Sequence, residues 1–156
     1  MMLTLSELMA VSTCHKKTDS KLNKTADKLG KSPDQKYWSY ENHLRYKRGK
    51  KVFDDGKKVV KELLKMSKDR KLDESNKLIV ENVIRDLLGA YRSIALLAIE
   101  EDESGCLGDK CAKKIEKRYN ELAKGDKEIA QGKPDRAVDK YKKAWEEDGK
   151  HGKNRY

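Results

Sequence analysis

The sequence predicts an all-α protein, an up-and-down bundle of about four helices with a basic, partly disordered N-terminal arm. Charged residues make up 41% of the chain and aromatic residues only 6%, with two prolines, a balance typical of solvated helices rather than sheet sandwiches. Apolar residues recur at helical spacing in four segments. The connections between these segments are short, so we expect neighbouring helices to be antiparallel.

Composition divides the chain into three parts. Residues 1–36 form an apolar start followed by a basic flexible arm, residues 37–147 form the bundle, and residues 148–156 form a polar tail. Pro33 marks the first boundary, because proline disfavours helical geometry at the residue before it. The formal net charge is +10, and the segment 15–51 alone holds 12 Lys and Arg against 4 Asp and Glu. The excess of positive charge is therefore expected in the arm, beside a nearly neutral bundle.

The first two predicted helices hold the larger apolar surface. The first of these helices ends near residues 67–75, and Gly56 is expected at a turn between its apolar positions Val52 and Val59. The second has Asp73 or Ser75 as its candidate N-cap and is apolar nearly all round, as expected of a central helix. The expected core positions of the two helices are Val52, Val59, Val60, Leu63 and Leu64, then Val80, Val83, Ile84, Leu87, Tyr91, Ile94, Ala95 and Ala98.

The last two predicted helices form a highly charged hairpin. The third begins after Asp109, a favourable N-cap residue, and Gly132 ends it. Pro134 suits the first turn of the fourth helix, where its missing N–H has no helical partner to lose. The expected inward residues are Cys111, Ile115, Tyr119, Leu122, Ile129 and Ala130, then Ala137, Val138, Tyr141, Ala144 and Trp145.

Cys106 and Cys111 bracket a glycine-containing turn between the second and third helices. Two side chains placed there can meet at disulfide distance without disturbing either helix. A bridge that closes so short a loop contributes about 2 kcal/mol through chain entropy, and it indicates an oxidising compartment. The alternatives are two reduced thiols in the cytoplasm, a reactive Cys111 acidified by the helix N-terminus with Lys110 and Lys113, and a pair of metal ligands.

The first 15 residues have an apolar centre like that of a weak export signal, although they contain Glu7 and lack a basic flank. The alternatives are a short apolar helix that packs on the bundle and a misassigned start. Cys14 ends a string, VSTC, that is similar to a lipoprotein cleavage site, so this third cysteine is a lipid-attachment site, an intermolecular bridge or a free thiol. The apolar run Leu87–Ile99 contains Arg92 and is too short to span a bilayer, so no transmembrane segment is expected.

The stretch from Tyr37 to Lys51 interleaves aromatic and basic residues and is the best candidate for a binding surface. Aromatic faces stack on bases or sugars, while Arg and Lys neutralise phosphates or other anions. In the alternative interpretation, Trp38 and one or two tyrosines cover the end of the bundle and the cations stay solvated. The candidate anion- or partner-binding residues are Tyr37, Trp38, Tyr40, Arg45, Tyr46, Lys47, Arg48, Lys50 and Lys51.

Catalytic and metal chemistry have little support in the sequence. The acidic run Glu100–Glu103 offers oxygens to a hard cation such as calcium, but it lacks the alternating aspartates and the glycine of an EF-hand loop. We expect it to be a solvated helix end, where acids oppose the helix dipole. The sequence contains no glycine-rich phosphate loop, no HExxH motif and no nucleophile with an evident partner. We therefore expect no enzyme activity, no cofactor and no metal site.

Two resemblances bear on the fold and its role. The segment GDKEIAQGKPDRAVDKYKKAW resembles the turn and second helix of a tetratricopeptide repeat, although Glu121 and Lys124 stand where that repeat has large residues. A solenoid needs about three such units, so this one is interpreted as an isolated hairpin. The stretch from Leu44 to Trp145 is similar to helical domains of unknown function in exported archaeal and bacterial proteins. The matching small and aromatic positions of the hairpin are Gly125, Gly132, Ala137, Tyr141 and Ala144.

The second resemblance implies an extracytoplasmic, noncatalytic helical module and supplies no functional residues. The leading hypothesis is therefore a noncatalytic interaction or structural module, cell-surface or secreted, that acts through contacts with a protein partner or with a second copy of itself. The second hypothesis is an anion or nucleic-acid binding protein that uses Tyr37–Lys51 together with the basic arm. The third is a redox or metal protein that uses Cys106 and Cys111.

Overall fold

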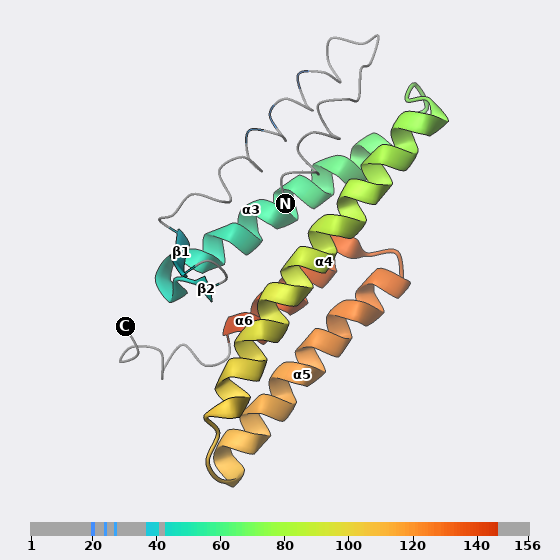
Figure 1. Cartoon of the computed structure of the whole chain (residues 1–156). Coiled ribbons are helices and arrows are strands. Elements are labelled where there is room, and N and C mark those ends of the chain that lie inside the picture. The colour runs from blue at the N-terminus through green and yellow to red at the C-terminus, as the bar shows by residue number, and fades with distance from the viewer. Residues whose placement is uncertain (1–19, 21–23, 25–26, 28–36, 41–42, 147–156) are drawn as a thin grey trace.

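The computed structural model describes residues 20, 24, 27, 37–40 and 43–146. The long helices of this part run alternately up and down, so the predicted all-α bundle is confirmed (Figure 1). The predicted flexible arm and polar tail lie outside the described residues, apart from Ser20, Lys24 and Asp27. The helices are α3 (Tyr46–Ser67), α4 (Glu74–Ser104), α5 (Asp109–Ala130) and α6 (Pro134–Glu146).

The helices pack around a central pair, α4 and α6. Each of these two contacts the other and also contacts both α3 and α5, which lie on either side (Figure 1). The second predicted helix, now α4, is central as expected, but the short helix α6 shares that position. Among the described residues, no helix combines the length and apolarity that crossing a membrane would require.

An aromatic cluster joins α3, α4 and α6 in the core. Phe53 is fully buried, and its ring centroid lies 5.5 Å from those of both Tyr91 and Trp145. Tyr91 and Trp145 were predicted core residues, whereas Phe53, the only phenylalanine of the chain, was not among them. The rings stack in tilted orientations, which are favourable for aromatic pairs.

The beginning of the bundle differs from the prediction. Two short antiparallel strands, β1 (Trp38–Tyr40) and β2 (His43–Leu44), precede α3. The first helix begins at Tyr46, ahead of the expected start near Val52, and Gly56 lies inside it rather than at a turn. Packing explains this glycine, because a Cβ atom at Gly56 would overlap the buried Tyr91 ring.

The ends of the later helices largely follow the predicted signals. Asp73 caps α4 by accepting a hydrogen bond of 2.9 Å from the backbone N–H of Asn76. The predicted cap of α5 is wrong by one residue: Gly108, with φ of 85°, is the N-cap and Asp109 is the first helical residue. At the other end, the N–H groups of Gly132 and Lys133 donate to carbonyls of the last turn, each at 2.9 Å. This Schellman arrangement needs the positive φ of 70° at Gly132.

The inner face of α5 is rotated towards α6 relative to the prediction. Ile115 and Leu122 are buried as expected, but Ile129 in the last turn is 39% exposed. Arg118 and Glu121 are buried instead, because these positions face α6, which covers that side of α5. The inner face of α6 is confirmed at every predicted position, namely Ala137, Val138, Tyr141, Ala144 and Trp145.

Candidate functional site

The aromatic residues at the start of the candidate binding stretch close one end of the bundle. Tyr37 is only 8% exposed, and Trp38 packs against the hydrophobic core. A Cβ atom at Gly49 would lie 2.6 Å from Cη2 of Trp145 and 2.8 Å from Cβ of Leu44, so the first turns of α3 lie directly on the Trp145 ring. The rings of Tyr37 and Trp38 therefore contribute to the packing of this end of the bundle. Tyr40, Tyr46 and Lys47 are placed by backbone alone, and their side chains lie outside the described part.

The cations of this stretch are divided between structural and solvated positions. Arg45 fastens β1, because its backbone N–H donates to the carbonyl of Tyr37 and its Nε to the carbonyl of Trp38, both at 2.7 Å. Nζ of Lys50 lies 3.4 Å from a carboxylate oxygen of Glu146. Arg48 and Lys51 are exposed on the first turns of α3. Binding of anions by this stretch stays a prediction.

Cys106 and Cys111 lie together where α4 leads into α5. Their sulfur atoms are at disulfide distance, and their Cα atoms are 5.6 Å apart. Cys106 follows the end of α4 and Cys111 belongs to the first turn of α5, so the pair staples the connection between these two antiparallel helices. Leu107, inside the stapled loop, is 93% exposed. The predicted pairing geometry is thus present.

A buried arginine, which the sequence analysis missed, joins three helices near this staple. The side chain of Arg118 on α5 is 1% exposed. Its Nε donates a hydrogen bond of 2.7 Å to the carbonyl of Ala144, in the last turn of α6, and its Nη1 donates to the carboxylate of Asp102 on α4. A cation at the end of α6 also complements the negative end of that helix dipole. In the sequence, the available signal for this buried arginine was a single charge within an otherwise apolar i, i+3, i+4 pattern.

The acidic run at the end of α4 is therefore more than the solvated helix end that we expected. Asp102 pairs with Arg118, and the carboxylate of Glu103 accepts a hydrogen bond of 2.7 Å from the hydroxyl of Tyr119. This hydrogen bond raises the pKa of Tyr119. Within the described residues, no three His, Cys, Asp or Glu side chains gather as metal ligands would. Two acids of the run thus hold α5 against α4.

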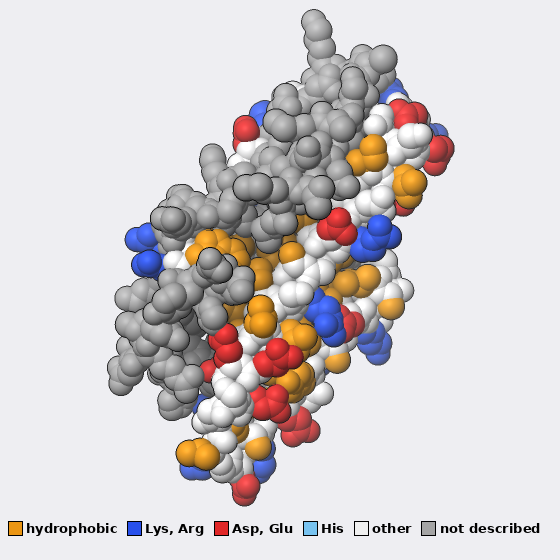
Figure 2. Space-filling model, viewed as in Figure 1, with side chains coloured by type: hydrophobic (Ala, Val, Ile, Leu, Met, Phe, Trp, Pro, Cys, Tyr) orange, Lys and Arg blue, Asp and Glu red, His pale blue; other side chains and the backbone are white. Residues whose placement is uncertain are grey.

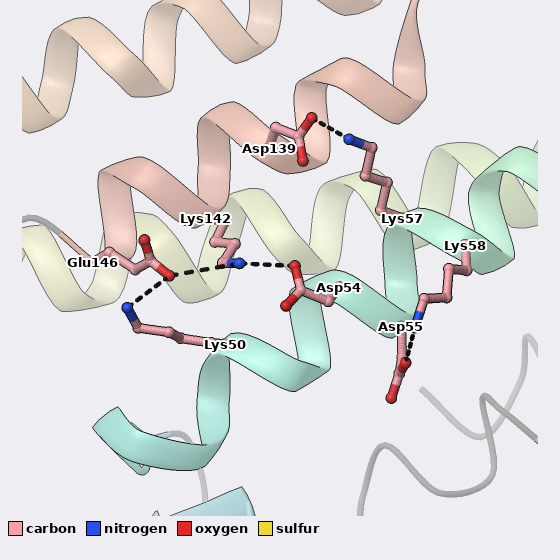
Figure 3. A network of polar contacts seen from close by, with 8 residues as sticks. All are labelled: Lys50, Asp54, Asp55, Lys57, Lys58, Asp139, Lys142 and Glu146. Atoms are coloured by element: carbon pink, nitrogen blue, oxygen red, sulfur yellow. Dashed lines mark hydrogen bonds and ion pairs between the residues drawn. The ribbon is translucent and has the colours of Figure 1, made fainter.

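Four ion pairs form a ladder between the antiparallel helices α3 and α6, shown for three of its pairs in Figure 3. Each step of 4, 3 and 4 residues along α3 is matched by an equal step back along α6. From one end of the ladder to the other, the pairs are Lys50–Glu146, Asp54–Lys142, Lys57–Asp139 and Lys61–Asp135. The Nζ–oxygen distances in the first, second and fourth of these pairs are 3.4, 2.7 and 3.8 Å.

This ladder fixes the register of α6 along α3. Its side chains are 22% to 51% exposed, so each pair contributes only about 0.2–1 kcal/mol. A shift of one turn would bring Lys50 towards Lys142 and lose the match of charges. Burial alone would lower the pKa of Lys142, but the hydrogen bond and charge of Asp54, together with the charges of Glu146 and Asp139, outweigh burial and raise it.

A second polar network joins α4, α5 and α6. The guanidinium of Arg92 donates to both carboxylate oxygens of Asp126, with Nε–Oδ1 and Nη2–Oδ2 distances of 2.9 and 3.1 Å. The hydroxyl of Tyr141 donates to the same carboxylate at 2.7 Å. Burial alone would raise the pKa of Asp126, but these hydrogen bonds outweigh burial and lower it. The Tyr141 ring lies on Gly125, where a Cβ atom would overlap it.

The polar residues that the structure brings together thus join helices to one another. Comparison of the chain with protein-family models, with curated proteins and with solved structures finds no match.

Proposed function

We propose that this chain is a noncatalytic helical interaction or structural module that works at the cell surface or outside the cell through protein contacts. The observation that carries the proposal is the Cys106–Cys111 pair, held at disulfide distance across the α4–α5 connection. A covalent staple at that point suits an oxidising compartment, where disulfides persist. It would restrain the longest helix of the bundle at the end where it leads into α5, which is an advantage for a small module.

The polar residues support the same proposal. The ladder between α3 and α6, the buried Arg118 and the Arg92–Asp126 pair all join helices to one another. Such pairs give the bundle a defined register and shape. The α5–α6 hairpin also has a small residue, Gly125, beneath an aromatic one, Tyr141, in keeping with the tetratricopeptide-like resemblance. A single hairpin of this kind serves here as one wall of the bundle.

The proposal is tested on protein purified from its native source. Thiols are alkylated before and after reduction, and the mass of the intact chain is measured. We expect Cys106 and Cys111 to react only after reduction. Cys14, which lies outside the described residues, serves as an internal standard for thiol reactivity if it remains in the mature chain. Alkylation of both cysteines without reductant would overturn the extracytoplasmic assignment.

The part played by protein contacts is tested in the same material. Lysine-directed cross-linking before purification, followed by mass spectrometry, is expected to join the bundle to a partner protein or to a second copy of itself. Cross-links confined to pairs within one chain would count against an interaction module. The mature N-terminus, read from the same spectra, reports whether the segment before Cys14 has been removed.

A further inference from the structure

Positive charge gathers on the outer face of the α5–α6 hairpin. Lysines recur along α5 at positions 110, 113, 117, 124 and 127, which is the spacing of one helical stripe. This stripe lies on the side of α5 opposite Ile115 and Leu122, which are buried against the rest of the bundle. The bundle is nearly neutral overall, as the sequence analysis expected, but part of its positive charge is gathered on this face.

Helix α6 extends the same positive surface. Arg136 and Lys143 are both exposed and are seven residues apart, so they lie on one face of α6. Glu121 of α5 locates this face beside the lysine stripe. Its carboxylate lies 2.5 Å from Nζ of Lys124 and 3.8 Å from Nζ of Lys140. The charge of Lys143 is also among those that lower the pKa of Glu121 against the effect of burial.

We define the basic ridge as the six exposed cations Lys110, Lys113, Lys124, Lys127, Arg136 and Lys143. From the first to the last of its lysines on α5, the ridge runs straight for about 25 Å at the rise of an α-helix. Two acids along its length, Glu121 and Glu128, are turned into the hairpin, and Glu121 is only 9% exposed. Two other acids of α5, Asp109 and Glu116, are exposed beside the ridge, so its six cations outnumber the exposed acids of this helix.

The acids of α6 face the opposite way. Asp135, Asp139 and Glu146 belong to the ladder with α3. Helix α4 carries seven acids against three cations, and acidic side chains gather near the end of the molecule where α4 leads into α5 (Figure 2). Most acids of α4 and α6 thus lie away from the ridge, which carries a net positive charge.

The ridge offers charge without an apolar centre. The exposed large apolar residues of the described part are Leu78, Leu97, Leu107 and Ile129, and none of them belongs to the ridge. Stable protein interfaces are depleted of lysine and rich in aromatic residues, and helices that lie in a membrane surface need an apolar face. A linear polyanion, in contrast, binds a row of lysines through charge alone, because binding releases the counterions condensed on the polymer.

We infer that the basic ridge binds a linear polyanion of the acidic polysaccharide class. The choice of a polysaccharide over a nucleic acid rests on the proposed function, because the cysteine pair suits a compartment outside the cytoplasm. The straight row of lysines lies along the polymer, and the cations of α6 contact the same chain from the side. Recognition depends on charge density, since lysine acts towards anions as a mobile point charge.

The test uses heparin as the acidic polysaccharide and measures its dissociation constant from the full chain at several salt concentrations. One variant combines Lys113→Gln, Lys127→Gln and Lys143→Gln, which neutralise the ridge. The control variant combines Lys68→Gln, Arg70→Gln and Lys71→Gln, which remove the same charge from exposed positions in the turn between α3 and α4. The unfolding midpoints of both variants in urea are measured first, and we expect them to be unchanged because all six side chains are exposed.

For the ridge variant we expect the slope of log K against log salt to fall by about 3, one for each lysine removed, and binding to weaken by on the order of tenfold at physiological salt. For the control variant, both quantities should stay close to those of the wild type. Equal losses of heparin affinity in the two variants would overturn the proposal, because they would show that binding depends on the net charge of the protein and not on the ridge.

Two competitors decide the class of polymer. Because recognition depends on charge density, heparin should bind more tightly than either competitor at equal charge concentration. Tighter binding of duplex DNA or of poly-glutamate would replace the polysaccharide with a nucleic acid or an acidic protein segment, and would overturn the assignment. The thiol measurement described above is independent of this result. Loss of ridge binding with an intact disulfide removes only the present inference, whereas reduced thiols with intact ridge binding remove the extracytoplasmic function and its choice of polymer.

Discussion

Three glycines show how single residues set the distances between helices in this bundle. Gly49 and Gly56 on α3 and Gly125 on α5 are buried, and each lies beneath an aromatic ring of a neighbouring helix. The partners of these glycines are Trp145, Tyr91 and Tyr141, respectively. Each ring occupies the volume that a Cβ atom would otherwise fill. Glycine costs a helix about 1 kcal/mol relative to alanine, and the close packing of the rings offsets that cost.

A pair of glycine substitutions tests this account. Gly56→Ala should destabilise the protein by about 2 kcal/mol, because the new methyl group would overlap the buried Tyr91 ring and force it to move. Gly89→Ala is the matched control: this glycine also lies inside a helix, but nothing beyond its own helix backbone lies within 4 Å of its Cβ position. It should stabilise the protein by about 0.5–1 kcal/mol through helix propensity. Urea unfolding measures both, and stabilisation by Gly56→Ala would contradict the account.

At the scale of elements, helix–helix register depends on charges that patterns of apolar residues do not reveal. The spacing of apolar residues, including the alanines and aromatic residues of α6, was enough to predict the helices and most of the α4 and α6 faces. The ladder was not predicted, because its two halves, 50–61 and 135–146, are far apart in sequence. The matching steps of 4, 3 and 4 residues indicate ion pairs only once α3 and α6 are known to be neighbours. The hairpin of β1 and β2 was not predicted, because the run of tyrosines and cations was interpreted as a binding surface.

The contribution of the ladder to register can be measured with a double-mutant cycle. Lys57→Asp and Asp139→Lys should each destabilise the protein, because each places like charges together, and the double variant should regain stability. We expect a coupling energy of about 1 kcal/mol at low salt, and a smaller one at about 1 M salt, where exposed charges are screened.

The control for this cycle is the pair Lys58–Asp55, which is also salt-bridged but lies within α3 alone. Its coupling energy should be only about 0.2–0.5 kcal/mol, the range for pairs on one helix. Equal coupling in the two cycles would show that the ladder contributes no more to the α3–α6 contact than an ordinary surface pair does.

Across the whole molecule, the strongest fastenings gather at one end. The start of α3, the end of α4, the start of α5 and the end of α6 lie at this end (Figure 1). There the Arg45 hydrogen bonds hold β1, the Arg118 bridge joins α5 to α4 and α6, and the cysteine staple joins α4 to α5. At the opposite end, α3 joins α4 and α5 joins α6 through short turns. We therefore expect the aromatic cluster beside the fastened end, around Trp145 and Phe53, to resist opening longest.

The same buried aromatic residues should make the bundle sensitive to alkali. Burial raises the pKa of both Tyr91 and Tyr141 above the usual value for tyrosine, and the hydrogen bond to Asp126 adds to the effect at Tyr141. A pKa that is higher in the folded state contributes stability that is present below the unfolded pKa of about 10 and is lost as pH rises above it. Each of these tyrosines should lower the free energy of unfolding by about 1.4 kcal/mol per pH unit in that range.

Tyr91→Phe isolates one of these contributions, since it keeps the ring over Gly56 and removes the phenol. Above pH 10, plots of unfolding free energy against pH should be shallower for this variant by about 1.4 kcal/mol per unit, while its slope below pH 9 should match the wild type. Absorbance of phenolate provides a second readout, because among the seven tyrosines Tyr91 and Tyr141 should ionise only as the protein unfolds. If all seven ionise while the helical circular dichroism is still intact, or if the two slopes coincide, Tyr91 does not couple alkaline pH to unfolding.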